Sequence, residues 1–413
     1  MIKAVLLDLD DTLLHVDTDV FVARYLTGLN TVVQRDYPAL GQGSFGKAMA
    51  LAVRAMAEDV DPTRTNAEIF AQTIGGKIDL TPDALLRTFD EYHGNGYGEL
   101  RSMAAPIDAA AALIDHLAGL GISVVIATNP VFKLDVVQQR LSWAGLESPR
   151  VPYALITHIG EMHFSKPQPH YYEEILTRIG AEADEAIMVG DNLHHDMIPA
   201  AKAGLNIYWI DWDNALPDDI PASAIPDGHG TLADFDRLVS EGWLATLQPR
   251  ARTAAQLIPR MIGNVGALYG LVATIKPAYW DMRPDPQEWS PLEIVCHLRD
   301  SERNVQHPRL QRILAEDNPF ISQPAPPPGP RARDLSGENG NVALDEFWQE
   351  RRETIRFIEN LRAEDWPRPA RHSIFGPTTL LEMAHFTTRH DHLHISQLCE
   401  TVGRCRQVTR QQP

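Results

Sequence analysis

The sequence predicts an α/β fold with a parallel sheet, followed by a separate all-α domain. Short apolar runs rich in Val and Ile alternate with helical stretches in the first part of the chain, which is typical of strands linked by crossover helices. After about residue 250 the pattern is helical throughout. A length of 413 residues exceeds what one hydrophobic core usually covers, so we expect two domains, 1–245 and 246–413.

Five apolar runs account for the strands of the expected sheet. They are unbroken rather than alternating, which indicates strands covered on both faces by helices, as in a Rossmann-like arrangement. The runs are AVLLDLD (4–10), SVVIAT (123–128), YALITH (153–158), AIMVGD (186–191) and NIYWID (206–211).

A long insertion separates the first two strands, from about residue 15 to residue 105. Its pattern is helical, so we expect a helical cap over the open end of the sheet. After the last strand, the segment PDDIPASAIPDGHG (217–230) is rich in Pro and Gly and predicts irregular structure. The segment LADFDRLV then closes the first domain.

The second domain contains four long helical patterns, which favour a four-helix bundle. A Pro- and Gly-rich segment, residues 323–341, joins the second and third patterns and is expected to be a long surface connection. The helical patterns cover residues 251–276, 290–315, 343–361 and 377–402.

Composition narrows the environment and the partners. The formal net charge of -18 argues against a nucleic-acid partner, because affinity for a phosphate backbone needs clustered Lys and Arg. No apolar run approaches the roughly 18 residues of a membrane span, and no basic segment precedes an apolar stretch at the N-terminus. The three cysteines form no CxxC motif. We therefore expect a soluble, cytoplasmic protein without nucleic-acid or membrane partners.

Polar side chains follow the strands of the first domain at the points where the strands end. In open α/β sheets, ligands bind at the carboxyl ends of the strands, so we expect these groups to converge on one crevice. They are Asp8 and Asp10 after the first strand, Thr128 and Asn129 after the second, Lys166 at the start of a helix, and Asp191 and Asp196 in GDNLHHD.

The residue types in this group predict phosphoryl chemistry. Several carboxylates close together repel one another and need a cation, and oxygen ligands favour Mg²⁺. A Thr hydroxyl, backbone N–H groups and a Lys ammonium suit a phosphoryl group. One carboxylate can act as a nucleophile, and a second carboxylate two residues further can protonate the leaving oxygen and then deprotonate water. The expected substrate is a small phosphorylated metabolite.

The motifs DLDDTLL, ATN, KP and VGDNLHHD resemble, in order, the four motifs of the haloacid dehalogenase (HAD) superfamily. The resemblance covers about residues 1–240, including the insertion where one type of cap sits in this family. It implies that Asp8 is the nucleophile and Asp10 the acid and base. Phosphatase-type members resemble this sequence in having an acid at the position of Asp10, which haloacid dehalogenases usually lack.

The resemblance also implies the other roles in this site. Thr128 and Lys166 would bind the phosphoryl group, and Asn129 would either assist them or cap a helix. The expected magnesium site is formed by Asp8, the backbone carbonyl of Asp10 and Asp191, with Asp196 orienting Lys166 or a metal-bound water.

Several neighbouring residues have a simpler interpretation. Asp11, His194 and His195 are interpreted as solvated or loop residues, and Lys47 and Arg54 of the insertion as part of a solvated helix face. The alternatives to a phosphatase are a mutase and a phosphonatase. A phosphonatase usually needs a cap lysine for an imine, and Lys47 is the candidate.

The second domain contains histidines at metal-binding spacing. His390 and His394 are four residues apart and therefore share one face of a helix, which lets two imidazoles bind one metal. His297, in another helix, is the candidate third ligand. Three His ligands would leave a coordination position open.

Three segments of this domain, EWSPLEIVCHLRDSE, FWQERRETIRFIENL and FGPTTLLEMAHFTTRHDHLHISQL, look like the DinB-like superfamily of four-helix metal proteins. The resemblance covers about residues 250–405 and implies that His297, His390 and His394 bind Zn²⁺, Ni²⁺ or Fe²⁺. This family includes bacillithiol and mycothiol transferases. The rival hypothesis is therefore that the bundle is a thiol-dependent transferase, or a metal-binding oligomerisation module that forms a homodimer, with the first domain in support.

Overall fold

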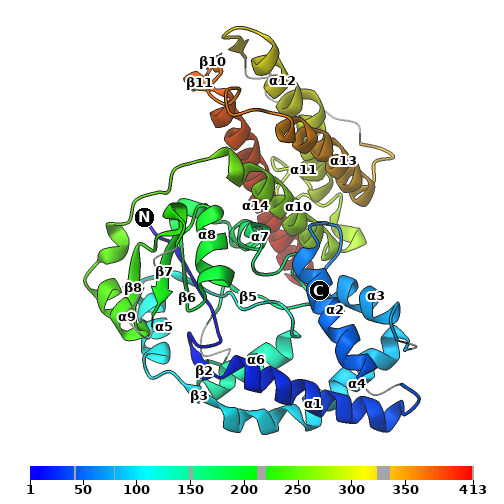
Figure 1. Ribbon diagram of the computed structural model, residues 1–413. Coiled ribbons are helices and arrows are strands. Elements are labelled where there is room, and N and C mark those ends of the chain that lie inside the picture. The colour runs from blue at the N-terminus through cyan, green and yellow to red at the C-terminus, as the bar shows by residue number, and fades with distance from the viewer. Residues whose placement is uncertain (41–42, 79, 148–151, 212–219, 323–334, 412–413) are drawn as a thin grey trace. The chain divides into compact units, whose positions relative to one another are not determined.

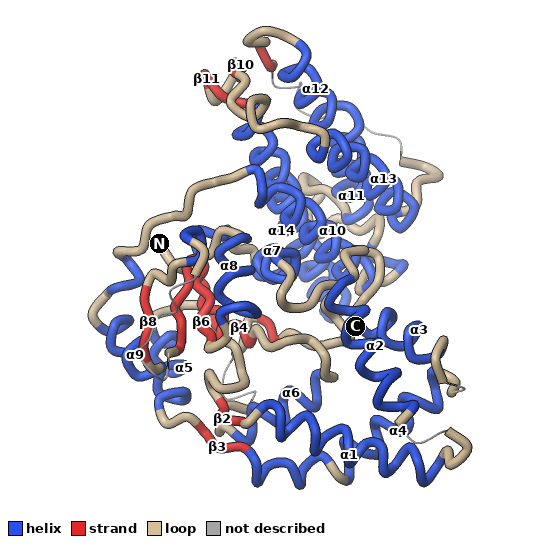
Figure 2. The backbone as a smooth tube through the Cα atoms, in the orientation of Figure 1, coloured by secondary structure: helices blue, strands red, loops and turns tan. Residues whose placement is uncertain are grey.

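The protein consists of two compact units, Met1–Ala251 and Arg252–Pro413. The computed structural model describes residues 1–40, 43–78, 80–147, 152–211, 220–322 and 335–411 (Figures 1 and 2). The boundary expected from the sequence, after residue 245, lies a few residues before this division.

A parallel sheet forms the centre of the first unit, with the strand order β5-β4-β1-β6-β7-β8. The first five strands along the chain fall within the apolar runs of the sequence, whereas β8 lies in the segment expected to be irregular. That expectation is wrong for Gly-His-Gly, because backbone pairing with β7 holds this edge strand without apolar side chains. The strands are β1 (Ala4–Leu7), β4 (Ser123–Ile126), β5 (Leu155–Ile156), β6 (Ala186–Gly190), β7 (Asn206–Ile210) and β8 (Gly228–Gly230).

Helices cover both faces of this sheet, as Figure 2 shows. Val5 and Leu7 of β1 pack in one apolar cluster with α5 and with Phe235 of α9. Ala4 and Leu6 point to the opposite face and are also buried, which explains the unbroken apolar sequence. The helices of this core are α5 (Ala109–Gly119), α6 (Leu134–Trp143), α7 (Pro169–Ile179), α8 (Ile198–Lys202) and α9 (Leu232–Ser240).

The insertion forms the expected helical cap. Asp17, Thr65 and Thr81 accept hydrogen bonds from backbone N–H groups at the starts of α1, α3 and α4, which fixes where these helices begin. The short strands β2 (Leu14–Val16) and β3 (Ala104–Pro106) pair antiparallel where the chain enters and leaves the cap. The cap helices are α1 (Thr18–Asp36), α2 (Ser44–Glu58), α3 (Asn66–Gly75) and α4 (Pro82–Asn95).

The second unit is built around helices α10, α11, α13 and α14. Val265, Val295, Phe347 and Leu398, one from each of these helices, share one core and are buried. The second helical pattern of the sequence is divided in the structure, because a π-helical turn at Glu302–Gln306 separates α11 from α12. The helices are α10 (Leu257–Ala273), α11 (Pro291–Ser301), α12 (His307–Ala315), α13 (Gly340–Glu359) and α14 (Leu380–Gln411).

A small sheet accompanies the helices of the second unit and was not expected from the sequence. Its strands β9 (Phe320–Ile321), β10 (Pro369–His372) and β11 (Gly376–Thr379) lie in the order β11-β10-β9. Residues 323–334 of the expected surface connection lie outside the described residues. Among the helices that the structure describes, each is too short or too polar to cross a lipid bilayer.

Candidate functional site

The polar residues that end three adjacent strands meet at one edge of the sheet. Asp8 follows β1, Thr128 follows β4 and Asp191 follows β6. Because β1 lies between β4 and β6, the Asp8 carboxylate is central, and the strand order reverses around it. Such a reversal opens a crevice at the carboxyl ends of the strands.

Lys166 ties two of the carboxylates together. Its ammonium donates hydrogen bonds to Asp8 Oδ1 at 2.7 Å and to Asp196 Oδ1 at 2.5 Å. Burial of this side chain disfavours its charge, but the carboxylates of Asp196 and Asp8 outweigh burial and raise the pKa of Lys166 well above its usual value. Lys166 is therefore a fixed positive charge beside the central carboxylate.

Asp8, Asp191 and Asp196 form a carboxylate cluster. Each offers one oxygen, and the three oxygens lie within 4.8 Å of one another. Burial, together with the charges of Asp8 and Asp196, raises the pKa of Asp191 to about 8. The cluster therefore holds more negative charge than Lys166 balances, and three carboxylates could hold Mg²⁺. At Gly190, a Cβ atom would overlap the Asp196 carboxylate, which explains the glycine before Asp191.

Asp10 has a partner that sequence reasoning missed. It forms an ion pair with Arg140 of α6, whose side chain is 2% exposed. The Arg140 guanidinium lies over the rings of Phe21, at 5.3 Å, and Phe132, at 5.7 Å. The sequence signal was an arginine on the buried face of α6, four residues after the buried Val136.

The remaining candidates of the first unit divide into two groups. Thr128 and Asn129 line the cavity described below, together with Arg54 and His195. Asp11 does not line it among the described residues; it has a φ of 53°, and its carboxylate accepts a hydrogen bond from the Val16 amide at 3.0 Å. Its geometry is that of a turn residue.

Lys47 and His194 are both exposed. Lys47 lies on α2 and is not among the described residues that line the cavity. His194 belongs to a π-helical turn, Leu193–Met197, which Asn192 caps by accepting hydrogen bonds from the amides of His194 and His195 at 3.0 Å each. These contacts give the two histidines a local structural setting.

A cavity of about 880 Å³ extends from the strand ends into the cap. The catalytic candidates Asp8, Asp10 and Lys166 lie among its lining residues, and much of the rest of the wall comes from the cap helices. The cap therefore encloses the space next to Asp8 in which a substrate could bind.

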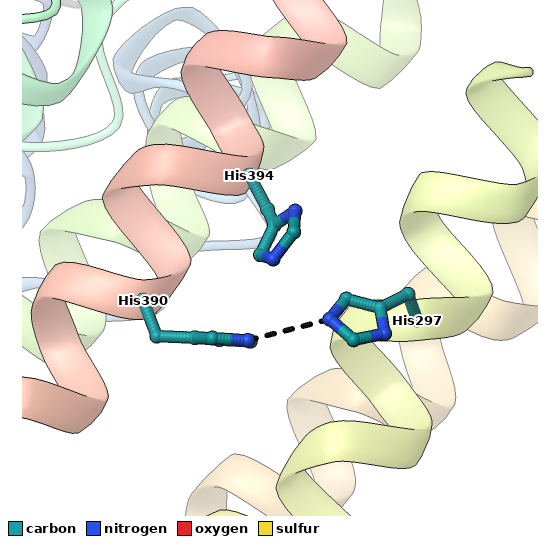
Figure 3. A group of neighbouring side chains, drawn as sticks. All are labelled: His297, His390 and His394. Atoms are coloured by element: carbon teal, nitrogen blue, oxygen red, sulfur yellow. Dashed lines mark hydrogen bonds between the residues drawn. The ribbon is translucent and has the colours of Figure 1, made fainter. Parts of the chain in front are cut away.

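The second unit brings its three candidate histidines together (Figure 3). His297 of α11 faces His390 and His394 of α14, with one ring nitrogen of each within 4.8 Å of the others. The Nε2 atoms of His297 and His390 are 3.3 Å apart. The Nδ1 atom of His394 lies 2.8 Å from Gln397 Oε1, which leaves Nε2 available as an acceptor. Three half-buried imidazoles in this arrangement could hold a transition metal.

A buried ion network lies next to these histidines. Arg351 donates to Glu302 at 2.7 Å and to Asp391 at 2.6 Å, and the three side chains are at most 2% exposed. One guanidinium faces two carboxylates, so the group carries a net negative charge. Asp391 follows His390 directly, and its carboxylate lies 3.9 Å from that imidazole.

The chain is similar in sequence to known phosphatases and in fold to a solved structure. Over 103 residues the chain is 33% identical to a phosphoserine phosphatase of Thermus thermophilus, covering 25% of this chain but only 39% of that enzyme. Over 245 residues it is 23% identical to pyrophosphatase PpaX of Bacillus cereus, covering 57% of this chain and 99% of that protein. A 2-haloacid dehalogenase structure from Pseudomonas syringae aligns with 59% of this chain and 100% of its own, at 20% identity and a TM-score of 0.42.

Two family models match separate parts of the chain. The model for haloacid dehalogenase-like hydrolases matches residues 2–204, which contain the sheet, the cap and the carboxylate cluster. The model for the DinB superfamily matches residues 265–398, which contain the three histidines. The first unit is therefore similar to the haloacid dehalogenase-like hydrolases over residues 2–204, and the second unit is similar to the DinB superfamily over residues 265–398.

Proposed function

We propose that the first unit is a Mg²⁺-dependent phosphatase that hydrolyses a phosphate monoester through an aspartyl-phosphate on Asp8. The observation that carries the proposal is the convergence of Asp8, Asp191, Asp196 and Lys166 at one end of an enclosed cavity. The family model that matches this unit describes hydrolases, and the phosphatase and pyrophosphatase named among its relatives support phosphate as the group transferred.

The carboxylate cluster fits Mg²⁺ by its chemistry. Its ligands are all oxygens. Burial and the neighbouring charges of Asp8 and Asp196 raise the pKa of Asp191, and a divalent cation would neutralise this negative charge. Bound Mg²⁺ would supply charge neutralisation for the phosphoryl oxygens. Asp8, the backbone carbonyl of Asp10 and Asp191 would hold the ion, and Asp196 would keep Lys166 in place.

Each residue at the strand ends has its own role in the proposed reaction. Asp8 attacks phosphorus, forming an acyl-phosphate bond as the ester oxygen leaves. Asp10, in its carboxylic-acid form, gives its proton to that oxygen. The carboxylate that remains, beside Arg140, then takes a proton from the water that hydrolyses the intermediate, which restores the acid. Lys166 and Thr128 bind the phosphoryl oxygens at the strand ends. Lys47 is exposed outside the described lining of the cavity, so the imine route of a phosphonatase finds no support there.

The test is a pair of isosteric variants assayed with an aryl phosphate and Mg²⁺. Asp8→Asn replaces the nucleophile by an amide and should lower the rate more than about a hundredfold, which corresponds to roughly 2.7 kcal/mol. Asp11→Asn is the matched control, because Asp11 is a turn residue outside the described cavity lining and an amide oxygen can still accept from Val16. The nucleophile assignment is wrong if Asp8→Asn keeps more than a hundredth of the rate.

A second function is proposed for the second unit, namely binding of one transition metal by His297, His390 and His394. It is supported by the approach of the three imidazoles and by the net negative charge of the adjacent Arg351 network. Imidazole ligands favour Zn²⁺, Ni²⁺ or Fe²⁺ over Mg²⁺.

Elemental analysis of the untagged full chain, supplied with each metal in turn, tests this second function. The expected result is one metal per chain, lost in the triple His→Ala variant and kept in His392→Gln, which alters a histidine of the same helix outside the cluster. The triple variant should retain phosphatase activity. Absence of stoichiometric metal, or unchanged metal content in the triple variant, would refute the site.

A further inference from the structure

The wall that the cap helices contribute to the cavity is largely apolar. Each of the four cap helices contributes apolar side chains to it, and several of these are large or aromatic. They include Val22 of α1, Met49 and Val53 of α2, Phe70 of α3, and Leu86 and Phe89 of α4. Val22 is 41% exposed and Leu86 is 49% exposed, so both apolar side chains have surface that a ligand in the cavity could cover.

The positive side chains of the cavity are already paired. Among its described lining residues, each Lys or Arg has a carboxylate partner. A second anionic group on a substrate would therefore have to displace one of these carboxylates. The pairs are Arg54 with Glu58, Lys133 with Asp90, Arg140 with Asp10, and Lys166 with Asp8 and Asp196.

His93 adds a polar group to this wall but no charge. It is 8% exposed, its Nε2 atom lies 3.1 Å from the Tyr25 hydroxyl, and its Nδ1 atom has no hydrogen-bond partner among the described residues. Burial lowers the pKa of His93 to about 4, so the imidazole is neutral near pH 7. It suits a neutral hydrogen-bonding atom better than a carboxylate or a second phosphate.

We infer that the substrate is a phosphate monoester of a bulky, apolar alcohol or phenol, rather than a small phosphate that carries a second anionic group. This inference rests on the proposed phosphatase function and extends it to a substrate class. The phosphoryl group would lie at the strand ends beside Lys166, and the organic group would cover the apolar side chains of the cap. The enzyme would discriminate between phosphate esters by apolar contact with the organic group, and a short or anionic organic group cannot make this contact.

Alkyl phosphates with similar leaving groups test the substrate class. The probes are n-hexyl phosphate, ethyl phosphate and 6-phosphooxyhexanoate, which has a hexyl-length chain ending in a carboxylate. We expect kcat/KM for n-hexyl phosphate to exceed that of each other probe at least about tenfold, a modest gain for several methylenes in an apolar pocket. Phosphoserine and pyrophosphate should be poorer substrates than n-hexyl phosphate.

A matched pair of variants on α1 links that preference to the cap. Val22 lines the cavity, whereas Val20, 52% exposed on the same helix, is not among its described lining residues. Val22→Asn should raise KM for n-hexyl phosphate at least about threefold and leave KM for ethyl phosphate unchanged. Val20→Asn should change neither value. On α2, Val53→Asn and its exposed neighbour Leu51→Asn form a second pair with the same expectation.

The outcomes separate the inference from the function on which it rests. Hydrolysis of none of the esters, including an activated aryl phosphate, would overturn the phosphatase and the inference with it. Asp8-dependent hydrolysis that favours ethyl phosphate, 6-phosphooxyhexanoate, phosphoserine or pyrophosphate would overturn the substrate class and leave the phosphatase intact. Equal effects of Val22→Asn and Val20→Asn would likewise overturn the inference.

Discussion

The position of the Asp10 carboxylate depends on a single buried arginine. Arg140 is enclosed by Phe21 and Phe132, and burial lowers its pKa to about 10, so its guanidinium remains charged near pH 7. The Asp10 side chain is 30% exposed and lines the cavity, and its ion pair with Arg140 fixes the direction in which the carboxylate faces. Arg140 is therefore a positioning residue for the proposed proton transfers, because Asp10 must reach the leaving oxygen.

The prediction at this scale concerns leaving groups. Asp10→Asn should slow poor leaving groups by roughly 10²–10⁴-fold and activated aryl esters less, because only poor leaving groups need a full proton. Arg140→Gln should give a smaller loss with the same dependence on the leaving group. Rates across a series of aryl and alkyl phosphates measure both effects.

A double variant is the control for this prediction. When Arg140→Gln is added to Asp10→Asn, it should lower the rate little further, because the residue that Arg140 positions is already inactive. If Arg140→Gln slows good and poor leaving groups equally, its role is structural only.

At the scale of elements, the two π-helical turns that the structure describes each precede a proline. Pro199 follows the turn Leu193–Met197, and Pro308 follows the turn Glu302–Gln306. A proline has no N–H to donate to the carbonyl four residues earlier, which favours a local widening of the helix. The carbonyl of His195, which Pro199 cannot serve, accepts a hydrogen bond from the Tyr172 hydroxyl at 2.8 Å. Asp196 and Glu302, which lie in these turns, both make buried ion pairs.

The buried network around Arg351 joins three elements of the second unit, namely α13, the turn at Glu302 and α14. Arg351→Met removes the only guanidinium of the described network and leaves two buried carboxylates facing each other. We expect a loss of about 3–5 kcal/mol in the free energy of unfolding. Urea denaturation measures the loss, taken from the unfolding transition of the second unit.

The neighbouring Arg352 supplies the control, since it is exposed and its guanidinium donates a hydrogen bond to Gln349 within the same helix. Arg352→Met should change the free energy of unfolding by less than about 0.5 kcal/mol. Similar effects of the two variants would mean that the buried network contributes no more than a surface contact.

At the scale of the whole molecule, the sequence was informative where chemistry follows from topology. Asp8, Thr128 and Asp191 could be expected together because parallel strands place their carboxyl ends at one edge, and His390 and His394 because of helical spacing. Arg140 could not be paired with Asp10, because the partner of a buried arginine depends on tertiary packing.

The apolar wall of the cavity was hidden for a similar reason. Each cap helix contributes only a few side chains to it, and their convergence depends on how the four helices pack. Strand β8 was missed because its Gly-His-Gly sequence has no apolar signal, and the edge of the sheet recruits it through the backbone. In both cases the information lies in contacts between elements rather than in local sequence.

The proposed phosphatase function requires that Asp8 becomes covalently phosphorylated during turnover. Mass spectrometry of the acid-quenched Asp10→Asn variant, after incubation with an aryl phosphate and Mg²⁺, tests it most directly, because this variant should form the intermediate and hydrolyse it slowly. We expect one phosphoryl group on the peptide that contains Asp8, and none on that peptide when Asp8→Asn is added to the variant. A phosphoryl group on another residue would contradict the assignment of Asp8. So would hydrolysis of the ester by the unsubstituted chain if neither that chain nor the Asp10→Asn variant yields a phosphorylated peptide.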